Sequence, residues 1–298
     1  MVPVFSGTGA SLSLTRAPRT LHSMELAGKN VVVTGAAGGI GSALVARCHA
    51  EGAQVVASDL ASNIAVAENL TAHLNLVRES SAVAVAADIA TERGNQSLVG
   101  TAEAAFGVID LFFANAGVAV GRDVDTPESE WQTAFNVNVH AHRWAAKYLL
   151  PAWLARGEGY FCSTASAAGL LSQIGSAPYA LTKHAAVAFA EWLSITHGDA
   201  GLKVSCLCPQ GVNTAMLRDG DASNPNDSGA GLGSSVVRAA GRVLEPEEVA
   251  DMVIAGIRAE AFLILPHPEV LTYLQRKTGD YDRWLSGMRK LQARMLAG

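Results

Sequence analysis

Asn30-Val31-Val32-Val33-Thr34-Gly35-Ala36-Ala37-Gly38-Gly39-Ile40-Gly41 is the stretch that decides the fold of this 298-residue chain. The apolar run predicts a buried strand, and the glycine-rich turn leads into a helical pattern from Ile40 to Ala50. Glycines at 35, 39 and 41 permit a sharp turn, close approach of an anion to the backbone, and close packing of helix on strand. This order predicts a phosphate-binding site, although a glycine turn without a ligand is the alternative.

Strand-like and helical runs alternate along the rest of the chain. Such alternation is typical of parallel strands joined by crossover helices. We therefore expect an α/β fold, a single doubly wound Rossmann-type domain with a seven-stranded parallel sheet. The expected strands are Val31 to Val33, Gln54 to Asp59, Val83 to Ala87, Leu111 to Ala114, Tyr160 to Ser163, Lys203 to Cys208 and Phe262 to Leu265. Long helices are expected over 128–154 and 178–197.

Two of these strands end at an aspartate. Asp59 lies about twenty residues after the glycine turn, where a dinucleotide fold binds the ribose hydroxyls of the adenosine. Asp88, followed by Ile89, could meet the adenine. The alternative for Asp59 is a helix N-cap or turn residue, and strand-end aspartates such as Asp88 are common in turns.

Tyr179 and Lys183 are one helical turn apart, and Ser166 precedes the tyrosine by thirteen residues. The lysine shares a helix face with the tyrosine and should lower the pKa of the phenol, so that it can exchange a proton with an alcohol or carbonyl. By itself this spacing more often marks a half-buried tyrosine beside a solvated lysine. The upstream glycine turn favours the catalytic interpretation.

These motifs resemble those of the short-chain dehydrogenase/reductase family in its common short form, over most of residues 24 to 298. Thr34 to Gly41 matches the family's glycine motif, Asn115-Ala116-Gly117 its Asn-Ala-Gly, and Asn138 its structural and catalytic asparagine. The resemblance implies a catalytic set of Asn138, Ser166, Tyr179 and Lys183, with Asn138 holding a water that links Lys183 to solvent. It implies cofactor contacts at Gly35, Gly38, Gly39, Ile40, Gly41, Asp59, Leu60, Asp88, Ile89, Asn115, Ala116, Gly117, Tyr179, Lys183, Pro209, Gly211, Val212 and Thr214, and substrate contacts at Ser166, Ala168, Gln173 and Met216.

The chain departs from the family in the loop that follows the sixth strand. Gln210 stands where the family usually has glycine after proline, which adds a side chain near the cofactor or merely a surface glutamine. A substrate lid is expected at about 215–243, and its part from Asp219 to Gly233 has the composition of a mobile loop. A C-terminal extension follows at about 267–298. Its Tyr273, Tyr281, Trp284 and Met288 indicate either a surface or subunit contact or a wall of the substrate pocket.

The expected activity is hydride transfer between NAD and a secondary alcohol or ketone. Asp59 with no basic residue nearby favours NAD over NADP, and the alternatives are an NADPH-dependent ketoreductase or a non-catalytic nucleotide-binding scaffold. A largely apolar substrate is expected because Leu170, Leu171 and Ile174 follow the serine. No obvious arginine pair is seen in this neighbourhood, and Arg218 is the one exception.

Composition limits the other classes of function. Charged residues make up 16% of the chain and the net charge is −5, which argues against nucleic-acid binding. No apolar run is long enough to span a membrane, and the four cysteines lack metal-ligand spacing, so neither membrane insertion nor a metal is expected. Residues 1–23 are expected to be a flexible N-terminal extension of a cytoplasmic protein, with a transit peptide as the alternative. Helix pairing typical of the family implies a homodimer or homotetramer.

Overall fold

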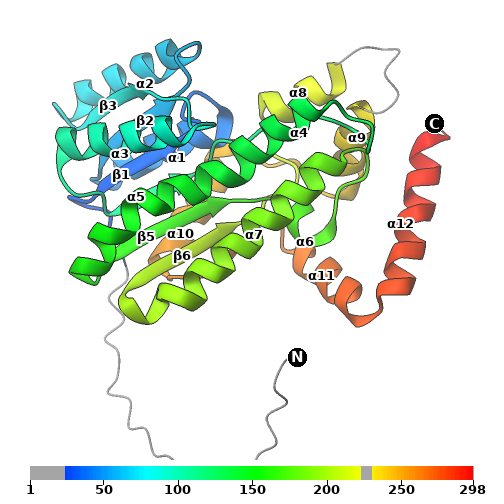
Figure 1. Cartoon of the computed structure of the whole chain (residues 1–298). Coiled ribbons are helices and arrows are strands. Elements are labelled where there is room, and N and C mark those ends of the chain that lie inside the picture. The colour runs from blue at the N-terminus through cyan, green and yellow to red at the C-terminus, as the bar shows by residue number, and fades with distance from the viewer. Residues whose placement is uncertain (1–23, 223–229, 298) are drawn as a thin grey trace, which may run out of the picture.

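A computed structural model describes residues 24–222 and 230–297 (Figure 1). The extension predicted at 1–23 lies outside these residues. A seven-stranded parallel sheet has the order β3-β2-β1-β4-β5-β6-β7, which confirms the predicted doubly wound α/β fold. The strands are β1 (Asn30–Thr34), β2 (Gln54–Asp59), β3 (Ala82–Ala86), β4 (Leu111–Ala114), β5 (Gly159–Thr164), β6 (Leu202–Leu207) and β7 (Leu263–Ile264).

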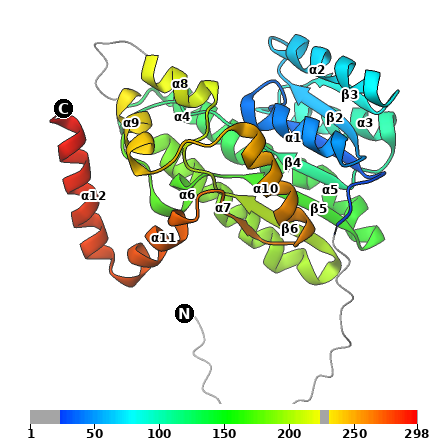
Figure 2. The ribbon, with the colours of Figure 1, turned by 180° about the vertical axis from the view of Figure 1, so that it is seen from behind.

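Helices cover both faces of the sheet, so each face has its own apolar core. On one face lie α1 (Gly39–Ala50), α2 (Ile64–Val77) and α10 (Pro246–Arg258), which bury Leu44, Ala67 and Val253 against the strands. On the other lie α3 (Glu92–Phe106), α5 (Ala141–Arg156) and α7 (Ala177–His197), which bury Leu98, Trp153 and Leu193. Figures 1 and 2 show the two layers from opposite sides. The central parts of the strands are mainly apolar because both faces are covered.

The helix expected over 128–154 is interrupted. It consists of α4 (Glu128–Phe135), a π-helical segment (Asn136–His140) and α5. A π-helical turn inserts a residue into the helical ladder and is frequent at functional sites. Asn138, the residue predicted to be catalytic, lies in the middle of this segment and is fully buried.

The lid region is more helical than its composition indicates. Parts of the stretch expected as a mobile loop belong to α8 (Ala215–Ala222) and α9 (Ala230–Ala240), while 223–229 lie outside the described residues. The two helices pack against each other, and such tertiary contacts can override low intrinsic helix propensity. After the lid, α10 begins at Pro246, and the Glu245 N–H donates to the Glu248 carboxylate at 3.0 Å.

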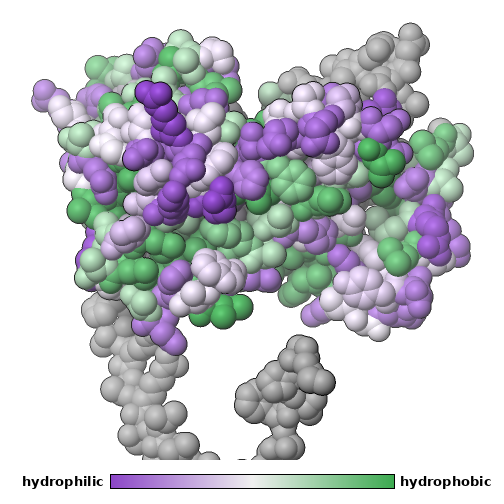
Figure 3. All heavy atoms as spheres, viewed as in Figure 1, coloured by the Kyte–Doolittle hydropathy of each residue, from purple (hydrophilic) through white to green (hydrophobic). Residues whose placement is uncertain are grey.

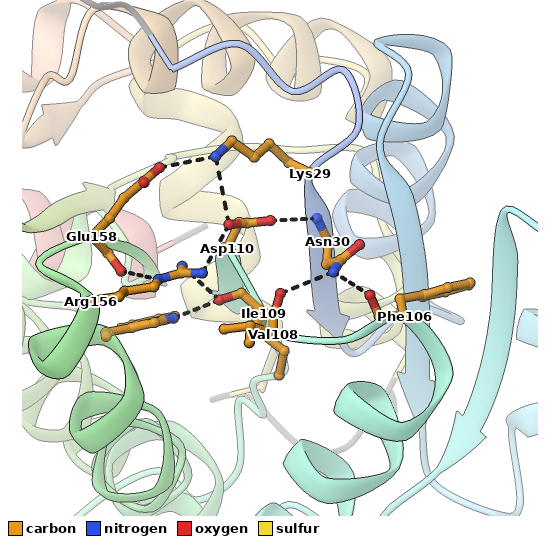
Figure 4. Close-up of polar contacts among 9 residues, drawn as sticks. Lys29, Asn30, Phe106, Val108, Ile109, Asp110, Arg156 and Glu158 are labelled. Carbon is orange, nitrogen blue, oxygen red and sulfur yellow. Dashed lines mark hydrogen bonds and ion pairs between the residues drawn. The ribbon is translucent and has the colours of Figure 1, made fainter.

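The amino ends of the central strands are joined by a network of charges (Figure 4). The Asp110 carboxylate accepts a hydrogen bond from the Asn30 N–H at 2.9 Å and forms ion pairs with Lys29 at 3.6 Å and Arg156 at 3.2 Å. The Asn30 side chain donates to the carbonyls of Phe106 and Val108. This network connects β1, β4 and the start of β5 at the edge of the sheet away from the glycine turn.

Two helices, α11 (Glu269–Gly279) and α12 (Tyr281–Leu296), follow β7 and form an arm at the outer edge of the molecule (Figures 1 and 2). The remaining short helices are α6 (Ala168–Leu171) and a 3-10 turn (Gly198–Ala200). Throughout 24–222 and 230–297, the helices are too short or too polar to span a lipid bilayer.

Candidate active site

A cavity of about 1830 Å³ opens along the carboxyl ends of the strands. The strand order reverses between β1 and β4, and ligands of open α/β sheets bind at such a switch point. In Figure 3 the surface is hollowed there, between the part of the molecule that carries α2 and the part that carries α8. The cavity extends from the glycine turn, past Ser166 and Tyr179, to the C-terminal arm.

The glycine turn has the geometry that an anion site requires. Gly35 has φ +69°, a conformation that favours glycine, and a Cβ on it would lie 2.9 Å from the Ala116 Cα. A Cβ on Gly41 would collide with the Gly35 carbonyl oxygen, and one on Gly39 would collide with Thr214. In the part of the chain that the structure describes, no side chain caps the N-terminus of α1, and its first residues line the cavity. These residues fit the pyrophosphate of a dinucleotide.

Thr34 fastens this turn to the end of β4. Its hydroxyl accepts hydrogen bonds from the N–H groups of Asn115 and Ala116 at 3.0 and 3.1 Å and donates to the Phe113 carbonyl at 3.1 Å. The Asn115 side chain donates back to the Thr34 carbonyl at 2.9 Å. The two motifs, some eighty residues apart in the sequence, therefore form one rigid wall of the cavity.

Asp59 closes the adenosine end of the site. One carboxylate oxygen accepts from the Ala37 N–H at 2.9 Å, and the other accepts from the Leu60 N–H at 2.8 Å and from Asn63 at 3.3 Å. Asp59 is thus held at the end of β2 beside the glycine turn. Asp88 is exposed, lines the same cavity and accepts a hydrogen bond from the nearby Ala90 N–H at 3.1 Å.

Ser166, Tyr179 and Lys183 lie close together beyond the carboxyl end of β5, at the end of the cavity opposite Asp59. Ser166 lies just after β5, accepts from the Ala168 N–H at 3.1 Å, and hydrogen bonds to the Tyr179 hydroxyl, which favours the phenolate. Ser176 caps α7 by accepting from the Tyr179 N–H. Lys183 is 2% exposed and donates to the Thr164 carbonyl at 3.0 Å. The arrangement offers a proton-transfer hydroxyl beside a hydrogen-bond donor.

The electrostatics of this group differ from the sequence-based expectation in one respect. Burial lowers the pKa of Lys183 from 10.5 to about 8. Burial raises the pKa of Tyr179, although the bond from Ser166 acts in the opposite direction. The expected lowering of the phenol pKa by Lys183 is therefore wrong for the free protein. The reason is geometric, since the lysine Nζ is directed at the Thr164 carbonyl and lies 5.7 Å from the centre of the Tyr179 ring.

Asn138 has a structural role in addition to the one the resemblance implies. Its side chain accepts from the Val118 N–H and donates to the Val118 carbonyl, both at 2.9 Å, and to Thr182 at 3.0 Å. A Cβ on Gly117 would lie 3.2 Å from the Lys183 Nζ and 3.3 Å from the Asn138 Oδ1, so glycine leaves the space between them free. Asn138 thus sits beside Lys183 but does not itself line the cavity.

Two supporting threonines were not anticipated from the sequence. Thr164 provides the carbonyl that holds Lys183, and its hydroxyl donates to Asn115 at 3.1 Å. Thr182 orients Asn138. Their positions, two residues before Ser166 and one before Lys183, are the signal that could have identified them.

The backbone of the loop that contains Gln210 is held by His267, a residue that the sequence analysis did not identify. The Gln210 N–H donates to Nδ1 of the buried His267 at 3.1 Å, and the other ring nitrogen of His267 donates to the carbonyls of Gly211 and Arg242, both at 3.1 Å. Gln210 lines the cavity and its buried Oε1 has no hydrogen-bond partner among the described residues. Gly211, expected among the cofactor contacts, faces Val237 and Val243 instead of the cavity.

The other expected cofactor and substrate residues lie around this one cavity. They are Gly35, Gly38, Gly39, Ile40, Gly41, Leu60, Ile89, Ala116, Gly117, Pro209, Val212 and Thr214 on the cofactor side, and Ala168, Gln173 and Met216 on the substrate side. Residues 24–222 and 230–297 contain no group of three or more His, Cys, Asp or Glu side chains that could hold a metal ion.

The expectation that the substrate region has no arginine pair is wrong, because arginines line the cavity and two of them come from the C-terminal arm. Arg218 donates to Asn213 at 2.8 Å and is not part of the lining, whereas Arg122, Arg276 and Arg294 are. Tyr273, Trp284 and Met288 also line the cavity. Tyr281 does not, and it is 53% exposed.

Comparison with known proteins agrees with this site. The family model of short chain dehydrogenases matches residues 29–224. The chain is 33% identical to 1-deoxy-11-beta-hydroxypentalenate dehydrogenase of Streptomyces avermitilis over 88% of this chain and 93% of that protein. It is 32% identical to meso-2,3-butanediol dehydrogenase of Serratia marcescens over 76% of this chain and 86% of that protein. A crystal structure of a short chain dehydrogenase/reductase from Burkholderia phymatum in complex with NAD superimposes with a TM-score of 0.78 and 27% identity, over 87% of this chain and 96% of that one.

The chain belongs to the short-chain dehydrogenase/reductase family. It is an oxidoreductase that uses a nicotinamide dinucleotide and interconverts alcohols and ketones.

Proposed function

We propose that the protein is an NAD-dependent dehydrogenase or reductase for a largely apolar secondary alcohol or ketone. The proposal depends on one observation: a single cavity joins the cofactor residues to the catalytic residues. Asp59 lies beside the glycine turn at one end of this cavity, and Ser166 and Tyr179 lie at the other end. When bound, the nicotinamide accepts or donates the hydride. The Tyr179 hydroxyl moves the proton of the substrate oxygen, and the Ser166 hydroxyl donates a hydrogen bond to that oxygen.

The choice of NAD rests on charge. The lining residues around Asp59 are Gly35, Ala37 to Gly41, Ser58, Leu60, Asn63 and Val66, and none of them is basic. A carboxylate about 4 Å from a 2′-phosphate costs roughly 4 kcal/mol at an effective dielectric near 20. The same carboxylate can accept hydrogen bonds from both ribose hydroxyls of NAD. The NAD complex of the structural neighbour supports this choice.

The test is the ratio of kcat/KM for NAD to that for NADP. Asp59→Asn keeps an acceptor for the Ala37 N–H but removes the charge, so the preference for NAD should fall by about two orders of magnitude. Asp88→Asn is the matched control, since it removes the other strand-end carboxylate of the cavity and should leave the ratio within about threefold. A parent enzyme that prefers NADP would overturn the assignment.

A non-catalytic scaffold is the remaining alternative. It predicts cofactor binding without any change in reduced-nicotinamide absorbance across a panel of alcohols and ketones. The assembled Ser166, Tyr179 and Lys183 favour the enzyme.

We also propose that the protein is a cytoplasmic homodimer or homotetramer assembled through α7. Large apolar side chains on this helix are exposed, namely Leu181 at 52%, Trp192 at 53% and Ile195 at 84%. Hydrophobic residues gather over α5 and α7 in Figure 3, and exposed apolar patches of this kind mark association surfaces. Ile195→Glu should convert the oligomer to monomer in sedimentation or light-scattering experiments. A parent protein that is monomeric at micromolar concentration would contradict the proposal.

A further inference from the structure

The C-terminal arm lies beyond the part of the chain that matches the family model, which ends at residue 224. It is nevertheless attached directly to the active site. Val270 of α11 is fully buried against Ala167 and Leu171, which follow the catalytic serine. Lys277 donates to the Leu170 carbonyl at 2.6 Å. The arm therefore has a defined position relative to Ser166.

One face of α12 lines the cavity. Trp284, Met288 and Leu291 are spaced by four and three residues, which places them on one side of a helix, and all three line the cavity and are half-buried. Leu285 and Arg289, which point in other directions, are exposed. Figures 1 and 2 both show α12 beside α9, at the outer edge of the molecule.

The space that this face encloses is large. Typical small-molecule sites have volumes of about 300–1,000 Å³, whereas the whole cavity measures about 1830 Å³. The lining of this cavity includes Tyr179 of the catalytic group and Trp284 of the arm. A small alcohol would leave most of this apolar wall uncovered.

The arm also brings positive charge to the cavity. Among the described residues of the arm, those that line the cavity include Arg276 and Arg294 and no acidic side chain. Arg276 lies 6.0 Å from the ring centre of Tyr273, which restricts where its charge can point. Residues 269–298 contain six basic and three acidic side chains in a chain of net charge −5. Such cations favour a ligand with a negative group.

We propose that the arm is a specificity element for a bulky, largely apolar alcohol or ketone that bears a carboxylate remote from its reacting carbon. The apolar body of the substrate packs on Trp284 and Met288 while its carbinol or carbonyl group meets Ser166 and Tyr179. The carboxylate is bound by Arg276, while Arg294, at the far end of α12, adds to the positive charge of the cavity wall without contacting the same carboxylate. This inference rests on the proposed function and names its substrate class.

The experiment compares three ketones with NADH in the holoenzyme: a bicyclic or tricyclic keto acid, the primary amide of the same molecule, and cyclohexanone. The parent enzyme should use the acid with a kcat/KM about 10–100-fold above the amide, the gain expected of a charge-assisted hydrogen bond. Cyclohexanone should be used more poorly than either. Equal use of the acid and the amide would overturn the proposal.

Substitutions in the arm test which side chains bind the carboxylate and the apolar body of the substrate. Arg276→Gln, alone and with Arg294→Gln, should reduce the preference for the acid about 10-fold or more, while the amide is affected less than about threefold. Arg289→Gln, on an exposed part of α12, is the matched control and should change nothing. Trp284→Ala should lower kcat/KM for the polycyclic ketones and spare cyclohexanone, with the exposed Leu285→Ala as its control. Identical substrate preference in Arg276→Gln and Arg289→Gln would overturn the assignment of Arg276 as the residue that binds the carboxylate.

The outcomes separate this inference from the proposed function. If none of the three ketones oxidises NADH, the proposed function itself fails. If cyclohexanone is reduced as well as the polycyclic ketones, the proposed function stands and the inference about the arm fails. A change of oligomeric state in Trp284→Ala without a change in substrate preference would assign α12 to a subunit contact and would also overturn it.

Discussion

The two ends of the parallel strands, called the amino edge and the carboxyl edge of the sheet below, bury charged groups in opposite ways. At the amino edge, the Asp110 carboxylate faces both Lys29 and Arg156, so its charge is balanced (Figure 4). At the carboxyl edge, Lys183 is buried with a carbonyl as its hydrogen-bond partner and without an ion pair among the described residues. A buried charge without a counter-charge costs stability, and burial lowers the pKa of Lys183 to about 8. We infer that the amino edge stabilises the fold and that the carboxyl edge trades stability for chemistry.

The largest expected effect tests the carboxyl edge. Tyr179→Phe removes the hydroxyl that moves the proton and keeps the ring beside Lys183, so kcat should fall by about 10²–10⁴-fold while cofactor affinity changes little. Steady-state kinetics and a cofactor titration by fluorescence measure the two quantities. Tyr148→Phe is the matched control, because its hydroxyl donates to Glu92 at 3.0 Å away from the cavity. Turnover of Tyr179→Phe within a few-fold of the parent would assign proton transfer to another group.

The second effect tests the cost of the unbalanced lysine. The pKa of Lys183 is about 8 in the folded protein and 10.5 without burial. Below pH 8 the lysine is protonated in both states and the fold bears the full cost of burying the charge. Between pH 8 and 10.5 the folded protein has released a proton that the unfolded chain keeps, so this group makes the free energy of unfolding rise with pH.

Lys183→Met removes that cost. The variant should therefore be more stable than the parent at pH 7, by on the order of 3 kcal/mol, and inactive. The difference should shrink as the pH rises from 8 to 10.5, as measured by urea unfolding over a pH series. Lys203→Met, whose parent residue forms an ion pair with Glu260, is the control and should show no such gain. A stability difference that stays constant with pH would contradict the assignment of the pKa to Lys183.

The two ends of the cavity also differ in how far the sequence predicted them. The glycine turn could be predicted because its constraint is local: Gly35 needs a positive φ, and Gly41 has no room for a Cβ beside the Gly35 carbonyl. The seven-stranded parallel sheet and the family were likewise predicted and are confirmed. Asp59 is held beside the glycine turn, as the strand-end position predicted, and its preference for NAD stays a prediction.

The substrate end could not be predicted in the same way, because its properties depend on packing between distant segments. The lid composition indicated a loop, yet α8 and α9 support each other as helices. The spacing of Trp284, Met288 and Leu291 is visible in the sequence, but what that face contacts depends on the direction of α11. The same holds for Arg276, and for His267, which fixes the Gln210 backbone from 57 residues away.

The smallest expected effect tests the amino edge. Asp110→Asn keeps an oxygen that can accept from the Asn30 N–H, but it leaves Lys29 and Arg156 facing a neutral group. Because the three side chains are only partly exposed, the loss should be about 1–2 kcal/mol of unfolding free energy in a denaturant titration. Glu158→Gln is the control: its carboxylate is 65% exposed and pairs with Lys29 at 3.0 Å, so it should cost at most about 1 kcal/mol. In both variants kcat/KM should stay within about twofold of the parent, since the network lies at the edge of the sheet away from Ser166 and Tyr179. A fall in kcat/KM for Asp110→Asn without a loss of stability would show that the two edges are coupled, and the division between them would then be wrong.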